Sequence, residues 1–347
     1  AGTPDELRAL HERQHWRLRH WETERDSITH RRFFNVTALI GMRVEDADVF
    51  SDTHGLIIDL VNEGQVDGLR VDHIDGLADS KTYLDRLAEA LPDTPVWVEK
   101  ILVGRETLRP DWKTAGTTGY EAGRLMARAL TDADGLAQLE QSWRDYTGDL
   151  GDFAGVLAQS KRDILHNELA AELHQLVGLG RAALAEDAAV EAGPESLREA
   201  VTALLTGMTR YRSYVDENGA DAQDRALIAA IVEGARPKLR SARVLEHLAA
   251  GLVQPGALLA KAQEDTAGFR WTPYLAGNDV GAEPAEATIE ADEANQFLAL
   301  RRPADMTLST SHDTKRSEDA RMRLAAISHL PGDFAGLVRA ADGLEAA

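Results

Sequence analysis

Helices and strands alternate in residues 46–102, and this alternation limits the possible folds more than any other feature of the chain. Amphipathic helices are predicted at about 46–63 and 80–91, and segments rich in β-formers follow them at 65–74 and 96–102. Strands separated by helices usually pair in parallel, within open sheets or barrels that are covered on both faces. We therefore predict an α/β fold with buried parallel strands.

Residues 68–76 (GLRVDHIDG) depart from the apolar pattern of a buried parallel strand because they carry several charges. Arg70 and Asp72 are two positions apart, so a strand directs both side chains to the same face. A buried carboxylate needs a charged partner, and Arg70 is placed to be one. The pair is either a structural ion pair that closes the strand end or part of a functional site.

Charged residues also lie at the ends of two other predicted strands. Glu99 lies within the 96–102 segment, and the pair His312-Asp313 follows a strand predicted at 306–312. Ligands bind at the carboxyl ends of strands in parallel α/β folds. Each residue also has a structural alternative, since Glu99 can form an ion pair and Asp313 can cap the following helix.

Two neighbours of these acids have more than one interpretation. Lys100 is either a surface charge or a ligand at the strand end. His73 and Asp75 suggest a metal site beside Asp72, but residues 72 and 73 face opposite sides of a continuous strand and make a poor chelate. We therefore predict no metal and no cofactor.

The sequence changes character after about residue 120. Residues 121–260 are rich in Ala, Leu and Glu and show helical spacing of apolar residues. We predict three parts: 1–120 as the first part of an α/β barrel, 121–260 as a helical insertion subdomain, and 261–347 as the return to the barrel. A polar helix is predicted at 1–25 and a further helix at 317–328.

Composition excludes several classes of protein. The formal net charge of −20 argues against nucleic acid, whose phosphates require a basic surface. The chain has no Cys, which excludes disulfides and thiolate sites. We find no apolar run near 18 residues and no signal-peptide pattern, so we predict no membrane association and a cytoplasmic location.

Three carboxylates at neighbouring strand ends suit the cleavage of a glycosidic bond. One carboxylate attacks the anomeric carbon, and a second, kept protonated, donates its proton to the leaving oxygen. A third can stabilise the positive charge of the transition state. Asp72, Glu99 and Asp313 are the candidates.

Several stretches resemble conserved regions of the α-amylase superfamily, glycoside hydrolase family 13. Residues 68–77 (GLRVDHIDGL) are similar to its nucleophile strand, and residues 98–102 (VEKIL) resemble its general-acid strand. Residues 309–319 (STSHDTKRSED) are similar to its last conserved region, in which His and Asp flank the sugar. The resemblance is closest to the trehalose-forming members, and it includes the stretches 31–34, 41–45, 116–120, 264–266 and 278–281.

The resemblance implies an α/β fold that contains part of a (β/α)8 TIM barrel of α-amylase type, strands 4 to 7, with a large α-helical insertion. It implies an isomerase, an intramolecular glucosylmutase of trehalose biosynthesis, acting on maltooligosaccharides or α-1,4-glucan. This enzyme converts the reducing-end α-1,4 linkage into an α,α-1,1 linkage by a retaining double displacement. Asp72 is then the nucleophile, Glu99 the acid and base, and Asp313 the third carboxylate. The implied substrate-binding residues are Arg70, His73, Lys100, Tyr120, His312 and Lys315.

Other readings stay open. An α-glucan hydrolase of α-amylase type shares the same three carboxylates, and an inactive glucan-binding fragment shares the motifs. The resemblance also implies functional coupling to a trehalose-releasing hydrolase.

The chain departs from the family pattern in several places. The family's first conserved region and the first three barrel strands are missing, and the chain ends before an eighth strand. His30 stands where the family usually has Tyr, and Gly281-Ala282-Glu283 stands where Gly-Gly-Asp is expected. We therefore predict an internal fragment or truncated form of a protein about twice as long.

Overall fold

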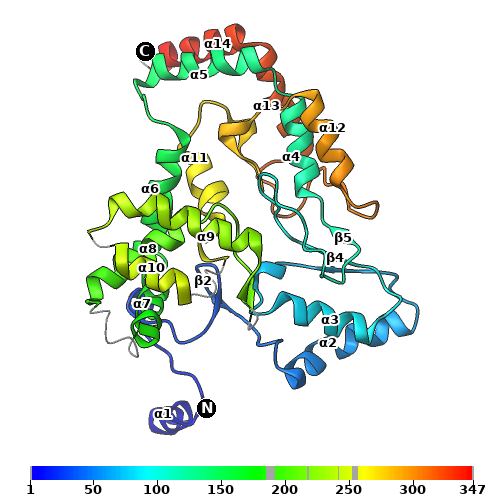
Figure 1. The fold of residues 1–347 in the computed structure, drawn as a ribbon, viewed down its shortest axis with the longest axis vertical. Coiled ribbons are helices and arrows are strands. Elements are labelled where there is room, and N and C mark those ends of the chain that lie inside the picture. The colour runs from blue at the N-terminus through cyan, green and yellow to red at the C-terminus, as the bar shows by residue number, and fades with distance from the viewer. Residues whose placement is uncertain (1, 185–191, 217–218, 241, 252–256, 346–347) are drawn as a thin grey trace.

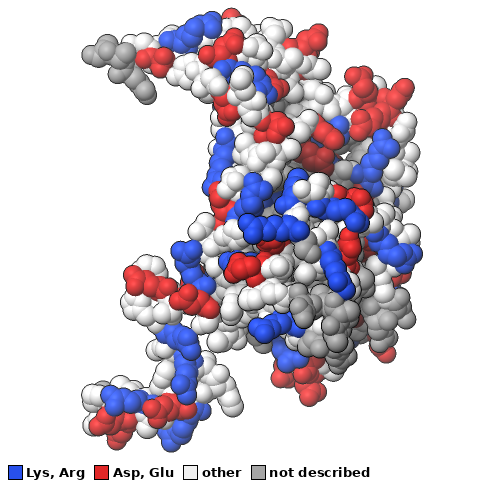
Figure 2. Space-filling model, turned by 60° about the vertical axis from the view of Figure 1, so that its left-hand side comes forward, with Lys and Arg blue, Asp and Glu red and all other residues white. Residues whose placement is uncertain are grey.

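The fold was obtained as a computed structural model, which describes residues 2–184, 192–216, 219–240, 242–251 and 257–345. Helices dominate the molecule, and the few strands are short (Figure 1). Among the described residues, no helix is long and apolar enough to cross a membrane. On the face shown in Figure 2, acidic and basic side chains are interspersed.

A parallel sheet of three short strands carries the central motifs. It consists of β3 (Leu69–Val71), β4 (Val96–Val98) and β5 (Gly116–Thr117), in the order β3-β4-β5. Helices α2 (Ala47–Asn62) and α3 (Ser80–Ala90) precede β3 and β4, as the alternation predicted. The core beside the sheet is formed by Phe50, Ile74, Tyr83, Leu84, Leu87, Leu91, Val96, Val98 and Trp112.

The predicted α/β fold is thus present only in part. The strand predicted at 306–312 does not form, and Met306 N–H donates to Thr117 O at 3.1 Å as an isolated contact. Farther along, Ser311 satisfies its backbone locally, since the Thr314 hydroxyl donates to Ser311 O and accepts from Ser311 N–H. Such side-chain bonds compete with a strand ladder. The described residues therefore do not show a barrel of strands 4 to 7.

The expected burial of β3 on both faces is also wrong. Arg70 and Asp72 are exposed, and Leu69 and Val71 are only half-buried. In the described part of the chain, β3 pairs with β4 alone. Within the described ranges, the other edge of β3 has no strand paired with it.

The N-terminal region is less helical than the predicted helix at 1–25. Helix α1 (Pro4–Glu12) begins at a capping box formed by Thr3 and Glu6. It ends early because its apolar residues, such as Leu7 and Leu10, are exposed and contribute no core. An antiparallel hairpin follows, β1 (Arg32–Phe33) and β2 (Val36–Ile40).

The Ala- and Leu-rich region is helical, as its periodicity predicted. Its helices are α4 (Tyr120–Ala129), α5 (Ala133–Thr147), α6 (Phe153–His166), α7 (Ala170–Leu184), α8 (Pro194–Gly207), α9 (Ala222–Ala235) and α10 (Ala242–Gly251). A two-stranded turn, β6 (Val215–Asp216) and β7 (Gly219–Ala220), lies between α8 and α9. Helices α6 to α10 share one large core whose fully buried members are Leu165, Leu169, Leu173, Leu197, Leu245 and Leu248.

The C-terminal part consists of helices and irregular segments. Its α-helices are α11 (Gly268–Arg270), α12 (Ala291–Leu300), α13 (Glu318–Ala326) and α14 (Pro331–Glu345). Helix α13 matches the helix predicted at 317–328. Helix α14 packs against α5, at one end of the molecule in Figure 1. A π-helical turn (Gln263–Ala267) precedes α11. The three-part division of the chain stays a prediction.

Candidate active site

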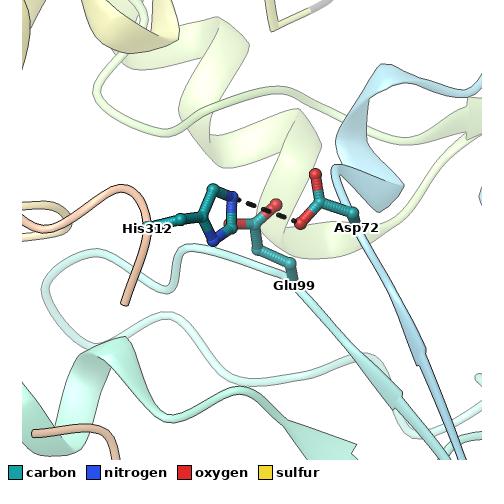
Figure 3. A group of neighbouring side chains, drawn as sticks. All are labelled: Asp72, Glu99 and His312. Carbon is teal, nitrogen blue, oxygen red and sulfur yellow. Dashed lines mark ion pairs between the residues drawn. The ribbon is translucent and has the colours of Figure 1, made fainter. Parts of the chain in front are cut away.

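Asp72 and Glu99 each follow the last residue of a parallel strand. Because β3 and β4 are neighbours, Glu99 N–H donates to Val71 O at 2.8 Å, and both carboxylates lie at one edge of the sheet. His312 approaches from the irregular segment before α13, and the three side chains point toward one another (Figure 3). One oxygen of each acid and a ring nitrogen of His312 lie within 4.8 Å of one another. The structure thus brings the three predicted strand ends together.

His73 turns the chain sharply immediately after Asp72. Its backbone is in the left-handed region, with φ 48° and ψ 48°, which is unfavourable for a residue with a side chain. This conformation directs His73 N–H to Glu99 Oε2 at 2.7 Å. The predicted strand 65–74 therefore ends at residue 71, and the argument that residues 72 and 73 face opposite sides does not apply.

The His73 ring is held away from open solvent by the hairpin that contains β1. Its centroid lies 4.9 Å from that of Phe33 and 4.8 Å from that of Phe34. Burial, together with the positive charge of Lys261, lowers the pKa of His73 to about 4. The imidazole is therefore neutral near pH 7.

Glu99 is the most enclosed of the predicted acids, with 7% of its surface exposed. Its Oε1 accepts from the Tyr120 hydroxyl at 3.1 Å and lies 3.3 Å from Arg70 Nη2. Burial raises the pKa of Glu99, and the negative charges of Asp72 and Asp313 add to this. The His73 N–H and the Arg70 charge oppose the shift without cancelling it. Glu99 therefore stays protonated to higher pH than an ordinary glutamate, as a general acid requires.

Asp72 has a more open setting. Half of its side-chain surface is exposed, its Oδ1 lies 2.5 Å from Arg70 Nη1, and the same oxygen lies 3.7 Å from His312 Nε2. Arg70 therefore contacts both Asp72 and Glu99. The pair is not the buried strand-end ion pair considered from the sequence, since both residues line an open edge.

Asp313 is held by a cation that sequence reasoning did not assign. Lys261 Nζ donates to Asp313 Oδ2 at 2.9 Å. Burial of Asp313 raises its pKa, but the hydrogen bond and charge of Lys261 outweigh this and hold that pKa below its ordinary value. The hydroxyls of Ser311 and Tyr120, 2.9 Å apart, connect the Asp313 segment to Glu99.

Two predicted substrate-binding lysines are already paired. Lys100 Nζ is 3% exposed and lies between Asp75 Oδ2 at 3.1 Å and Glu106 Oε1 at 3.0 Å. This contradicts the expectation that Lys100 binds a sugar directly, because its ammonium group has no open approach. Lys315 pairs with Asp265, at the π-helical turn.

The sequence analysis assigned no role to Glu264. Its two carboxylate oxygens lie 2.7 and 2.8 Å from the Tyr211 hydroxyl, and burial raises the pKa of Glu264 to about 7. The stretch 264–266 was noted only for its resemblance. The pairing with Tyr211 left no signal, because 53 residues separate the partners.

Two hollows meet at these residues. A cleft of about 710 Å³ runs along the β1–β2 hairpin past Asp72 and His73. A small cavity shares Phe33, His73 and Asp75 with this cleft and is otherwise lined by Glu99, Ile101, Tyr211, Lys261, Glu264, Val280 and Asp313. Asp72, Glu99 and His312 have the donor atoms of a metal site, but Arg70 already supplies positive charge to both acids.

Comparisons with known proteins agree with the geometry. No family model matches the chain. A Mycobacterium tuberculosis protein, provisionally named maltooligosyl trehalose synthase, is 36% identical over 338 residues, which cover 93% of this chain. The solved maltooligosyltrehalose synthase of Arthrobacter ramosus is 34% identical, with a TM-score of 0.86 over 99% of this chain. A solved glycosyltrehalose synthase, DSM5389, has a TM-score of 0.78 at 28% identity over 99% of this chain.

These matches confirm the resemblance and its extent. The chain spans 42% of the Mycobacterium protein, 45% of the Arthrobacter chain and 43% of the DSM5389 chain. It therefore corresponds to only part of each relative, as the missing motifs predicted.

Proposed function

We propose that this chain, a homologue of the maltooligosyltrehalose synthases over part of their length, carries the catalytic acids of an intramolecular glucosylmutase. The substrate class is a maltooligosaccharide with a free reducing end. The reaction replaces the α-1,4 bond to the last glucose by an α,α-1,1 bond. The observation that carries the proposal is the convergence of Asp72, Glu99 and His312 at one edge of the parallel sheet.

In the first step, Asp72 attacks the anomeric carbon of the penultimate glucose and forms a β-glycosyl ester. Glu99 gives its proton to the oxygen of the departing reducing-end glucose, which balances the bond cleavage. The exposure of Asp72 supports this role because a nucleophile must reach the sugar. The raised pKa of Glu99 supports the acid role.

In the second step, the released glucose turns within the site and presents its own anomeric hydroxyl. Glu99, now ionised, removes the proton of that hydroxyl while its oxygen displaces Asp72. Two displacements retain the configuration. This agrees with the spacing, since oxygens of Asp72 and Glu99 lie within 4.8 Å and retaining enzymes hold their carboxyl groups about 5–5.5 Å apart.

Asp313 and His312 are proposed to hold the sugar at the reacting bond. The Lys261 ion pair supports an ionised Asp313 at neutral pH, and such a charge stabilises an oxocarbenium-like transition state. Arg70 is proposed to orient Asp72 through their ion pair. Tyr120 is proposed to orient Glu99.

We further propose that β3, β4 and β5 are part of a (β/α)8 barrel that a longer protein completes. The similarity to much longer synthases and the single pairing of β3 support this. The cytoplasmic location and the coupling to a trehalose-releasing hydrolase remain predictions from the sequence.

The test incubates the protein that contains this chain with maltopentaose and follows reducing ends and chain length together. The mutase removes reducing ends without shortening the chain. New reducing ends and shorter products indicate a hydrolase instead, and binding without turnover indicates an inactive glucan-binding protein. Either of those results would refute the proposal.

A further inference from the structure

A segment between the helical core and the catalytic residues has no place in the mechanism above. Residues 210–214, here called the bridging segment, follow α8 and precede β6. Arg212 and Ser213 in this segment are almost completely buried. Arg212 lies against residues 72–78, here called the catalytic turn, which starts at the proposed nucleophile.

Arg212 binds the backbone of the catalytic turn at several points. Its Nη1 donates to Asp75 O at 3.0 Å and to Leu77 O, and its Nη2 donates to Ala78 O at 3.4 Å. The remaining carbonyl between them, Gly76 O, accepts from Arg31. Two guanidinium groups thus serve four consecutive carbonyls, from the second residue of the 3-10 turn (Ile74–Gly76) to the residue before the N-cap of α3. Buried carbonyls need such partners, and only a planar fork of donors reaches several at once.

Tyr214 adds a contact to a side chain of the same turn. Its hydroxyl donates to Asp75 Oδ1, while Lys100 Nζ lies 3.1 Å from Asp75 Oδ2. Lys100 directly follows Glu99. The bridging segment therefore contacts the nucleophile's turn directly and the general acid's strand through Asp75 and Lys100.

The bridging segment is itself fixed at both ends. The Tyr211 hydroxyl bonds to Glu264, and Tyr214 N–H donates to Asp224 Oδ2 at 2.8 Å, near the start of α9. The preceding helix, α8, contributes several buried side chains to the core of α6 to α10. The segment is thus a rigid connection from the helical region to the catalytic turn.

From these contacts we infer that Arg212 and Tyr214 are positioning residues: they hold the catalytic turn so that Asp72 and the His73 N–H are correctly placed against Glu99. The His73 N–H reaches Glu99 only while the left-handed turn persists. The helical insertion is then required for catalysis although none of its side chains need touch the sugar. This inference rests on the proposed function for its kinetic consequences but not for its structural ones.

The first test measures amide hydrogen exchange in the Arg212→Met protein. Peptides covering residues 73–78 should exchange at least about tenfold faster than in the wild type, while peptides of the α6–α10 core keep their protection. Arg210→Met is the matched control, because Arg210 belongs to the same segment but faces Asp224 at 4.0 Å. Exchange at residues 73–78 that stays at the wild-type rate in Arg212→Met would overturn the inference, whether or not the protein turns over maltooligosaccharides.

The second test uses kinetics of the active, longer protein. Arg212→Met should lower kcat about 10- to 100-fold, since an ångström of misplacement has that effect. It should also move the alkaline limb of the rate profile to higher pH, because Glu99 loses the His73 N–H that lowers its pKa. A simple loss of folded protein lowers the rate equally at every pH and leaves the alkaline limb in place. An alkaline limb that does not move in Arg212→Met therefore contradicts the positioning role of Arg212.

Tyr214→Phe decides the question if Arg212→Met does not fold. This variant removes one hydroxyl and keeps the ring beside Arg212, whose Cζ lies 4.8 Å from its centroid. Three results in this variant support the inference. The rate should fall about three- to tenfold, the alkaline limb of the pH–rate profile should move to higher pH, and amides of residues 73–78 should exchange faster. If residues 73–78 of Tyr214→Phe exchange at the wild-type rate and the alkaline limb of its pH–rate profile does not move, the inference is refuted. If wild-type protein shows no turnover, the proposed function fails, and the exchange measurements alone decide the role of the segment.

Discussion

At the scale of single residues, the candidate site works by giving two carboxylates different surroundings. Asp72 is half exposed and beside a cation, whereas Glu99 is enclosed and near two other acids. Burial and neighbouring negative charges favour the protonated form of Glu99, while Asp72 lies in the open and is paired with Arg70. Opposite environments of this kind are what a nucleophile and a general acid need.

Glu99→Gln tests this division of roles in the longer protein. The amide cannot donate an acidic proton, so turnover of a maltooligosaccharide should fall at least about 10²-fold. A glucoside with an activated leaving group needs little protonation, and its first step should be affected far less. Burst kinetics with both substrates separate the two effects. Equal losses on both would remove the acid role, and Glu89→Gln, an exposed substitution, serves as the unaffected control.

Glu264 predicts a pH dependence of stability rather than of chemistry. Its pKa is about 7 when folded, because of burial, against an ordinary value near 4.5, so the folded state binds the proton more tightly. The stability of the protein should therefore fall as pH rises from about 4.5 to 7, by roughly 3 kcal/mol from this group. Glu264→Gln should flatten that decline in urea unfolding. A decline that is equally steep in both proteins would contradict the assignment.

At the scale of elements, the conformation of one glycine lets the catalytic segments meet. Gly119 lies between β5 and α4 with φ 93°, and a Cβ there would overlap the Met306 carbonyl. Met306 N–H also donates to Thr117 O. This close approach holds the segment that leads to His312 against the end of β5. Tyr120, the next residue, bonds to Glu99.

Gly119→Ala should therefore destabilise the protein by more than the backbone term alone. The left-handed conformation costs Ala about 1–2 kcal/mol, and the overlap with Met306 adds to it. Gly148→Ala is a matched control, because Gly148 also has positive φ (72°) but has nothing within 4 Å of its Cβ position. Urea midpoints of the two variants measure the difference. Equal losses in both would show that the contact with residues 306–308 is unimportant.

The elements that were predicted well are those whose pattern is local. Helices α2 and α3 and strands β3 and β4 follow from periodicity and from the β-formers between them. The strand predicted at 306–312 does not form. Near its end, the Ser311 N–H donates to the Thr314 hydroxyl in a local turn, an alternative that periodicity does not reveal. The early end of β3 depends on the left-handed His73, which no local pattern favours.

Contacts between residues far apart in the sequence could not be predicted from local patterns. Asp72, Glu99 and Asp313 were placed at strand ends, and the structure brings them together. Lys261 and Arg212 were not identified, because each acts across more than 50 residues of sequence. The sequence also did not reveal that Lys100 pairs with Asp75, 25 residues away, because this ion pair forms only on folding.

At the scale of the whole molecule, the described chain leaves apolar surface and a strand edge open. Leu56 of α2 is 72% exposed and Ile40 of β2 is 67% exposed. Other exposed apolar residues in these two regions are Val36, Leu39, Met42 and Ile57. Large exposed apolar patches and unpaired strand edges favour association with other protein surface. The relatives are more than twice as long, so further chain is the natural cover.

Residues 1–347 alone should therefore turn over maltopentaose at least about 10²-fold more slowly than a longer protein that supplies the missing strands. The reason is that, among the described residues, β3 pairs with β4 alone, so one edge of the strand that leads to Asp72 has no strand beside it. The same comparison should reveal concentration-dependent association of residues 1–347 in sedimentation velocity, and Leu56→Lys should weaken it. Full activity of monomeric residues 1–347 would show that the three-stranded sheet needs no completion. In that case the similarity to longer synthases would reflect shared ancestry of an independent catalytic unit.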